Sequence, residues 1–124
     1  MKYAIIIARV LLGIVFVVFG SNAFLHFIPM PPPPRGDAGA FISALIHSGY
    51  LYVVATLQVL GGLCLLSGRF VPLGLTLLGP VIFNILCFHI FFDPKGMPIA
   101  IIISILALFL LWACRDKFPA IFQP

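Results

Sequence analysis

The sequence predicts an all-α membrane protein: a four-transmembrane-helix bundle with a short interfacial helix between helices 1 and 2, built as one domain over residues 1–124. Of these residues, 63% are hydrophobic and 8% are charged. In a typical soluble domain, about a quarter of the residues are charged. Four apolar runs approach the roughly 20 residues that a spanning helix needs. The runs are continuous and lack the period-two alternation of a membrane barrel, so helices are the only spanning structure expected.

The first spanning helix is expected over Ala4 to Phe27. Lys2 and the small residues at 21–23 also give this segment features of a cleavable secretory signal. Its apolar run is too long for the hydrophobic region of a signal, however, and Arg9 interrupts it, so we expect an uncleaved helix. The favoured interpretation of Arg9 is that its side chain extends to the inner headgroups. The alternative is a buried partner, such as a helix C-terminus or a lipid phosphate.

Glycines in the first two spans predict close contacts between helices. Gly13 and Gly20 lie on the same helix face as Arg9, within about 40° of one another. Gly61 and Gly62 belong to a similar stripe in the second span. Small residues at these positions let another helix backbone approach closely.

A Pro-rich loop, residues 28–37, follows the first helix. Its prolines forbid helix and favour a stiff, extended segment along the outer surface. Asp37 is a suitable N-cap for a short helix over residues 38–48, and Gly49 would end that helix. Because the helix is too short to span, we expect it to lie in the interface or dip into the outer leaflet.

The remaining spans are expected over Tyr50 to Ser67, Val71 to Phe92 and Met97 to Ala113. Gly68 at the end of the second span and Pro72 at the start of the third predict a tight antiparallel hairpin. Pro80 has no N–H for the carbonyl four residues before it, so we expect a kink in the third span.

Basic residues are scattered singly at helix ends, which indicates the positive-inside pattern and not a nucleic-acid surface. The side with more of them would hold Lys2, Arg9, Arg69, Arg115 and Lys117. The other side would hold Arg35 and Lys95. We therefore expect a multi-pass protein of the bacterial inner (plasma) membrane, with both termini cytoplasmic, the lipid bilayer as partner and no nucleic acid.

Several function classes lack their usual residues. The chain has no glutamate, and its three aspartates lie outside the long apolar runs, so ion-driven transport has no carboxylate relay in the membrane. No Ser-His-Asp set, phosphate loop or carboxylate pair is present, which sets aside hydrolases and phosphotransferases. The three cysteines form no Cys-x-x-Cys pair, so a dithiol mechanism has no motif.

Almost all the polar groups expected to be buried in the membrane fall in the outer half of the bilayer, and five of them are the candidate site. They are Asn22, His26, Gln58, Asn84 and His89. Because hydrocarbon offers them no partners, we expect them to converge inside the bundle, beside the kink. Three interpretations stay open. They are interhelical hydrogen bonding, a pocket for a quinone whose carbonyls need donors, and a haem or metal site, for which no His-x-x-x-His pair is present.

Several motifs, taken in their order, resemble the small DoxX-like membrane proteins over nearly the whole chain. They include Arg9-Val10-Leu11-Leu12-Gly13, Gly61-Gly62-Leu63, Gly68-Arg69-Phe70, Asn84-Ile85 and Trp112-Ala113. The resemblance implies a four-helix membrane bundle. It also implies a redox association, since the family takes its name from a subunit associated with thiosulfate:quinone oxidoreductase in archaea.

The resemblance also shows a departure. Many family members carry lysine where this chain has Ala23 and glutamate where it has Gln58, which implies an intramembrane ion pair that is missing here. We therefore expect an auxiliary or quinone-contacting component of a redox system, with a redox partner protein or a homo-oligomer as open possibilities. The alternatives are a structural scaffold without ligand and a small-molecule permease.

Overall fold

The structure, a computed structural model, describes residues 1–29 and 31–124, with the side chain of Phe122 excepted. Its helices are α1 (Lys2–Leu25), α2 (Asp37–Ser48), α3 (Tyr50–Ser67), α4 (Val71–Phe91) and α5 (Met97–Ala113). Short 3-10 turns follow α4 and α5: η1 (Pro94–Gly96), η2 (Arg115–Lys117) and η3 (Pro119–Phe122). Within the described residues, four helices are long and apolar enough to cross a membrane, which confirms the predicted fold class.

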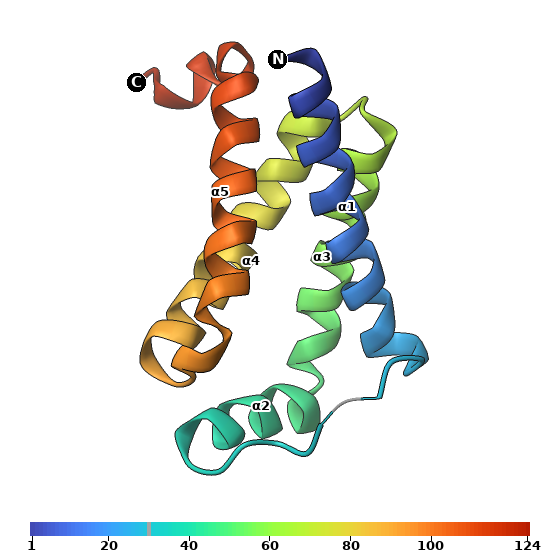
Figure 1. Cartoon of the computed structure of the whole chain (residues 1–124), viewed down its shortest axis with the longest axis vertical. Helices are drawn as coiled ribbons and strands as arrows, with labels where there is room; N and C mark the ends of the chain where they lie inside the picture. Colours follow the sequence, from blue (N-terminus) through green and yellow to red (C-terminus); the bar gives the residue numbers. More distant parts are fainter. Residues whose placement is uncertain (30) are drawn as a thin grey trace.

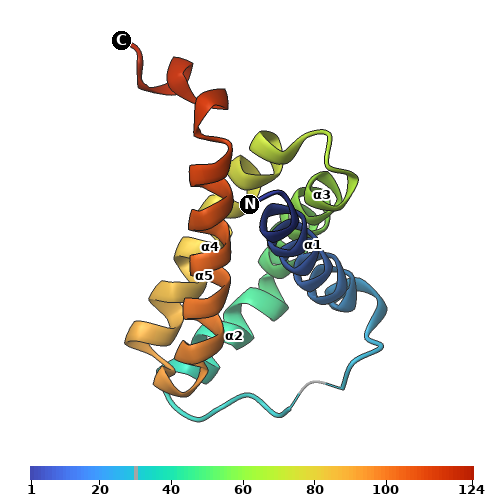
Figure 2. The same cartoon turned by 45° about the horizontal axis from the view of Figure 1, so that its top comes forward.

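The four long helices close a ring in the order α1, α3, α4, α5, because α1 packs against α3 and α5, and α4 packs against the same two helices. Both termini lie at one end of the bundle, and α2 lies across the other end (Figures 1 and 2). We call these two ends the termini end and the α2 end. Only 17–28% of the residues in the most apolar stretch of each long helix are buried inside the protein, so most apolar side chains face outward, toward lipid.

Most helix boundaries follow the predicted signals. Gly49 ends α2 with φ 82° and Gly68 ends α3 with φ 73°, both in the left-handed region that favours glycine. Two details differ. Helix α1 ends at Leu25, because His26 adopts a left-handed conformation with φ 55°. The expectation that Asp37 is an N-cap is wrong, since Asp37 is the first residue of α2 and its side chain makes no capping hydrogen bond.

The predicted glycine contact joins α1 and α3. A Cβ atom placed on Gly62 would lie 2.9 Å from the Gly13 carbonyl oxygen and 2.7 Å from Val17 Cγ2. A Cβ on Gly20 would lie 3.0 Å from the Ala55 carbonyl oxygen. The two backbones therefore touch at two levels about two turns apart, which only small residues allow.

Helix α3 uses its neighbouring glycines for opposite partners. While Gly62 faces α1, a Cβ on Gly61 would lie 2.5 Å from Leu78 of α4, and one on Gly74 of α4 would lie 2.9 Å from the Gly61 carbonyl oxygen. Helix α3 is thus in close backbone contact with α1 on one side and α4 on the other. The core between the four long helices is filled by fully buried side chains, namely Leu12, Phe16, Leu65, Leu78 and Leu110.

Arg9 binds the C-terminus of α3. Its Nη1 donates hydrogen bonds to the carbonyl oxygens of Leu65, at 2.6 Å, and Leu66, at 3.1 Å. These carbonyls have no donor within their own helix, and the negative end of the helix dipole favours a cation there. The favoured interpretation, an Arg9 side chain that extends to the headgroups, is therefore wrong, and the alternative of a helix C-terminus is right.

The glycine contact leads to a first prediction. Gly62→Ala should destabilise the protein, because the new Cβ meets the α1 backbone and α1 must move. Gly79→Ala is the matched control, since no atom lies within 4 Å of a Cβ at Gly79. Alanine gains about 1 kcal/mol of helix propensity over glycine, so the control should be neutral or stabilising. Thermal unfolding in detergent, followed by circular dichroism, measures both. Equal effects of the two changes would contradict the contact.

A second prediction concerns Arg9. Arg9→Ala should lower the free energy of unfolding by about 2 kcal/mol, the scale of a hydrogen bond to a charged group, and Arg9→Lys should recover part of the loss. Arg69→Ala removes the same charge from an exposed residue near the same helix end and should change stability by less than about 0.5 kcal/mol. Unfolding in mixed detergent micelles would give these values. A loss as large for Arg69 as for Arg9 would show that charge at this end, and not the bond to α3, matters.

Candidate functional site

Asn22 lies in the last turn of α1, and His26 is the C-cap residue of that helix. Asn22 is buried, with 6% of its surface exposed. Its Oδ1 accepts the Ile28 N–H at 2.7 Å, its Nδ2 donates to the Ile28 carbonyl at 3.4 Å, and its own carbonyl accepts the His26 N–H at 2.9 Å. The Asn22 side chain thus holds the chain as it leaves the helix, while the His26 side chain is exposed.

Asn84 and His89 bind backbone groups near them in sequence. Asn84 is exposed, and its Nδ2 donates to the Pro80 carbonyl at 2.8 Å. His89 Nδ1 lies 3.0 Å from the Asp93 carbonyl, and its ring packs against Gly96, where it leaves no room for a Cβ. His89 therefore stabilises the turn between α4 and α5.

Gln58 is half-buried on α3, and its Cβ lies 3.0 Å from the position that a Cβ on Gly20 would take. The structure therefore does not bring the five predicted site residues together in one pocket. Asn84 is exposed and bound to its own helix, and of the five residues only His26 lines a described depression, so the expected convergence beside the kink is wrong. Within residues 1–29 and 31–124, no three His, Cys, Asp or Glu side chains gather as metal ligands.

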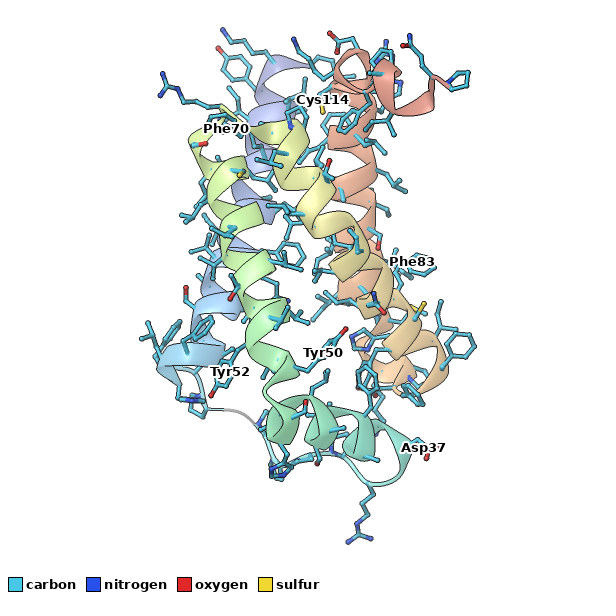
Figure 3. The ribbon with its side chains drawn as sticks, turned by 180° about the vertical axis from the view of Figure 1, so that it is seen from behind. Asp37, Tyr50, Tyr52, Phe70, Phe83 and Cys114 are labelled. Carbon is cyan, nitrogen blue, oxygen red and sulfur yellow. The ribbon has the colours of Figure 1, made fainter. Side chains whose placement is uncertain are left out.

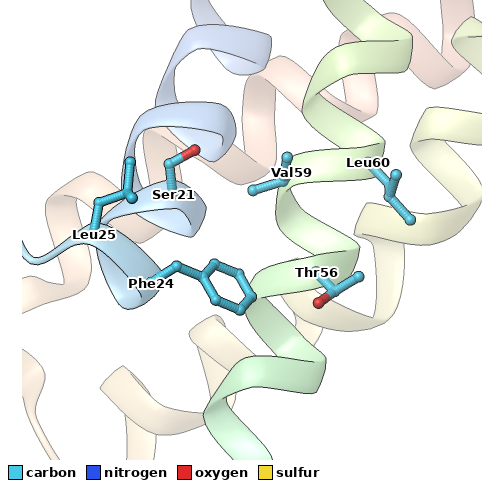
Figure 4. Close-up of a pocket in the computed structure, with 6 residues that line it drawn as sticks. All are labelled: Ser21, Phe24, Leu25, Thr56, Val59 and Leu60. Carbon is cyan, nitrogen blue, oxygen red and sulfur yellow. The ribbon is translucent and has the colours of Figure 1, made fainter.

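A groove lies instead on the outer surface between α1 and α3 (Figure 4). We call it the α1–α3 groove, and its volume is about 330 Å³. It is lined by Ser21, Phe24 and Leu25 of α1 and by Thr56, Val59 and Leu60 of α3. The Thr56 hydroxyl donates to the Tyr52 carbonyl at 2.7 Å. The groove is therefore mainly apolar, with the hydroxyl of Ser21 as a second polar group.

A smaller hollow of about 60 Å³ lies at the α2 end. It is lined by Ala23, His26, Ile46, Leu51 and Tyr52. Phe24 lines the groove and Tyr52 lines the hollow, and the centroids of these two rings are 5.3 Å apart. This aromatic pair therefore separates the two depressions. The surface therefore offers an apolar groove, a pair of rings beside it, and the polar atoms of His26 and Tyr52 at the hollow.

Sequence reasoning missed the groove, although a signal for it exists. Its lining residues repeat at spacings of three and four residues in both helices, which places each set on one helix face. The two faces meet only because α1 and α3 run antiparallel in the register that the glycine contact sets. That register depends on tertiary packing, so it cannot be predicted from the sequence of either helix alone.

The thiols do not form a redox pair. Cys64, Cys87 and Cys114 are free and partly buried, and they lie on α3, on α4 and at the end of α5. Burial, and then the negative charge of Asp116, raise the pKa of the Cys114 thiol above its usual value. Less of this thiol is therefore the reactive thiolate at neutral pH.

The family model described as DoxX matches residues 4–90, which extend from the first turns of α1 almost to the end of α4. The chain belongs to the DoxX family. It is also similar to the uncharacterized protein YwoB of Bacillus subtilis (strain 168), at 30% identity over 122 residues, covering 93% of this chain and 79% of that protein. No solved structure matches the chain. The family resemblance is thus confirmed, and the fold is that of a multi-pass membrane protein.

Proposed function

We propose that this DoxX-family protein is an auxiliary, quinone-contacting component of a redox system. The observation that supports the proposal is the position of the α1–α3 groove and the hollow at His26, one beside Phe24 and the other beside Tyr52, whose rings lie against each other. A quinone has a flat head with carbonyl acceptors and a long apolar tail. The rings suit its head, and the groove suits its tail.

The polar atoms beside the ring pair suit the quinone carbonyls. The Tyr52 hydroxyl and the His26 imidazole are hydrogen-bond donors, and both side chains border the hollow. Of the five residues predicted from the sequence, the proposal keeps His26 in contact with ligand. It gives Asn22, Asn84 and His89 their backbone partners instead, and leaves Gln58 on α3 beside Gly20.

The proposed role is auxiliary, with another protein delivering the electrons. Reduction of a quinone takes two electrons and two protons, and the separated cysteines of this chain offer no dithiol to supply them. A redox partner protein would be the source. The competing function is a structural scaffold, which the backbone bonds of Asn22, Asn84 and His89 favour.

We infer that both termini are cytoplasmic in a bacterial inner membrane. They lie at one end of the bundle (Figure 1). The termini end carries five basic residues and one acid, Asp116, for a net charge of 5 − 1 = +4. The α2 end carries Arg35 and Lys95 with Asp37 and Asp93, for a net charge of 2 − 2 = 0. The basic end is the one that the positive-inside rule keeps in the cytoplasm.

Cysteine labelling tests this orientation. In a cysteine-free background, Arg35→Cys should react with a membrane-impermeant maleimide in intact spheroplasts. Lys117→Cys should react only after the membrane is opened. The reverse pattern would invert the topology.

Quinone binding can be tested on the full chain in lipid nanodiscs with a short-chain ubiquinone as the probe. His26→Ala and Tyr52→Phe should each raise the Kd about five- to thirtyfold, or about 1–2 kcal/mol for one lost hydrogen bond. His47→Ala is the matched control: His47 is also an exposed histidine near the α2 end, but it lines neither depression. Its Kd should stay within about twofold of the parent chain, a negligible free-energy change.

Two results would contradict the proposal. One is absence of binding by the parent chain, which would favour the scaffold. The other is an equal loss for His47 and His26, which would place the quinone elsewhere or make its binding nonspecific. Circular dichroism of each variant shows whether the helices are retained.

A further inference from the structure

Helix α4 carries a second regular face, directed away from the bundle. Its residues alternate at spacings of four and three along the helix, which is the seam pattern of helices that pack in pairs. They are Leu73, Leu77, Pro80, Asn84, Cys87 and Phe91. We call this set the α4 seam. It lies opposite the buried face of α4, which includes Leu78 and Ile82.

The described part of the chain leaves this seam largely uncovered. Leu73 is 51% exposed and Phe91 is 75% exposed, Pro80 and Asn84 are exposed as well, and Leu77 and Cys87 are half-buried. Phe83, next to Asn84 in the chain, projects outward from the bundle in Figure 3. The seam is therefore a surface that either lipid or another helix must cover.

The hydrogen-bonding groups of Asn84 favour another helix over lipid as the neighbour of this seam. One N–H of its amide is used by the Pro80 carbonyl at 2.8 Å. Its Oδ1 acceptor and its second N–H make no hydrogen bond within the described chain, and lipid tails supply none. The hydroxyls of Thr56 and Thr76, also exposed on long helices, differ, because each donates its one proton to the carbonyl four residues earlier. Asn84 is left with polar capacity that another protein surface must meet.

Pro80 adds to the polarity of the same region. Having no N–H, it cannot donate to the Thr76 carbonyl four residues before it, which therefore loses its usual helical partner. Thr76 is itself exposed on the outward side of α4. The stretch from Thr76 to Asn84 is thus poorly suited to pure hydrocarbon.

We propose that the α4 seam is the interface between two copies of this chain, related by a two-fold axis parallel to the membrane normal. A primary amide is self-complementary, since the Oδ1 of each Asn84 can accept the free N–H of the other. This reciprocity favours a second copy over a different subunit. Both copies have the same orientation in the membrane, so the two α4 helices run parallel, and a single asparagine in such a seam fixes the register.

The interface is compatible with the proposed quinone site. Helix α4 packs against α3 and α5 in the ring of helices, and the groove lies between α1 and the far side of α3. A dimer through α4 would leave both grooves open to lipid. The dimer does not depend on quinone binding, so each proposal can fail without the other.

The chain supplies its own probe, because Cys87 lies in the seam one turn after Asn84. The full-length double variant Cys64→Ser, Cys114→Ser retains only Cys87. In lipid vesicles, oxidation by copper-phenanthroline should link two Cys87 thiols as a disulfide, with two protons released and two electrons taken up by copper. The matched control, Cys87→Ser with Cys114→Ser, retains only Cys64. Cys64 faces α4 inside the bundle, where its Cβ would lie 2.9 Å from a Cβ on Gly74, so this control should stay monomeric.

Energy transfer between labelled copies in vesicles measures the role of Asn84. Asn84→Leu should weaken dimerisation about three- to twentyfold, the range of hydrogen bonds between helices in membranes, and Asn84→Gln should retain part of the affinity. Ile90→Leu changes a residue that is 52% exposed on α4 but lies off the seam, and it should have no effect. Asn84 is outside the bundle core, so its variants should remain folded, and circular dichroism checks this.

Three outcomes would overturn the dimer. They are a Cys87-only chain that stays monomeric at every protein-to-lipid ratio, cross-linking of the Cys64-only control to the same extent, and an Asn84→Leu variant that dimerises as well as the parent.

Discussion

The close contact between α1 and α3 is the constraint on which the other features depend. Because Gly13 and Gly62 bring the two backbones together, the Arg9 side chain reaches the last carbonyls of α3. The same contact, continued at Gly20, sets the register that aligns the lining faces of the α1–α3 groove. Loss of the contact would therefore affect the helix cap and the candidate site together.

Sequence patterns predict the parts of this structure that depend on composition and local backbone chemistry. The four spans follow from continuous apolar runs, and the ends of α2 and α3 follow from Gly49 and Gly68. Partners that depend on tertiary register could not be predicted in the same way. Arg9 donates to a carbonyl 56 residues later in the chain. No local sequence pattern predicts a partner so far away in the sequence.

The gathering of polar residues in one half of the bundle has a different cause from the one expected. Interruptions of helical hydrogen bonding lie beside these residues: the end of α1, Pro80 near the middle of α4, and the turn after α4. Asn22, Asn84 and His89 each lie within four residues of one of these interruptions and bind a backbone group beside it. A break exposes carbonyls and N–H groups that hydrocarbon cannot satisfy. Polar side chains therefore accumulate near the breaks whether or not a ligand binds.

The Arg9 cap also has a consequence for biogenesis. The ribosome makes Arg9 long before Leu65, so α1 must enter the membrane while its guanidinium still has no carbonyl to bind. An arginine in a spanning helix costs up to about 3 kcal/mol on insertion scales, the value for the helix centre. Until α3 arrives, the favourable position for α1 is one displaced toward the membrane surface, where water can solvate the charge. Docking of α3 would then draw α1 to its final depth, which makes assembly of this bundle an ordered process.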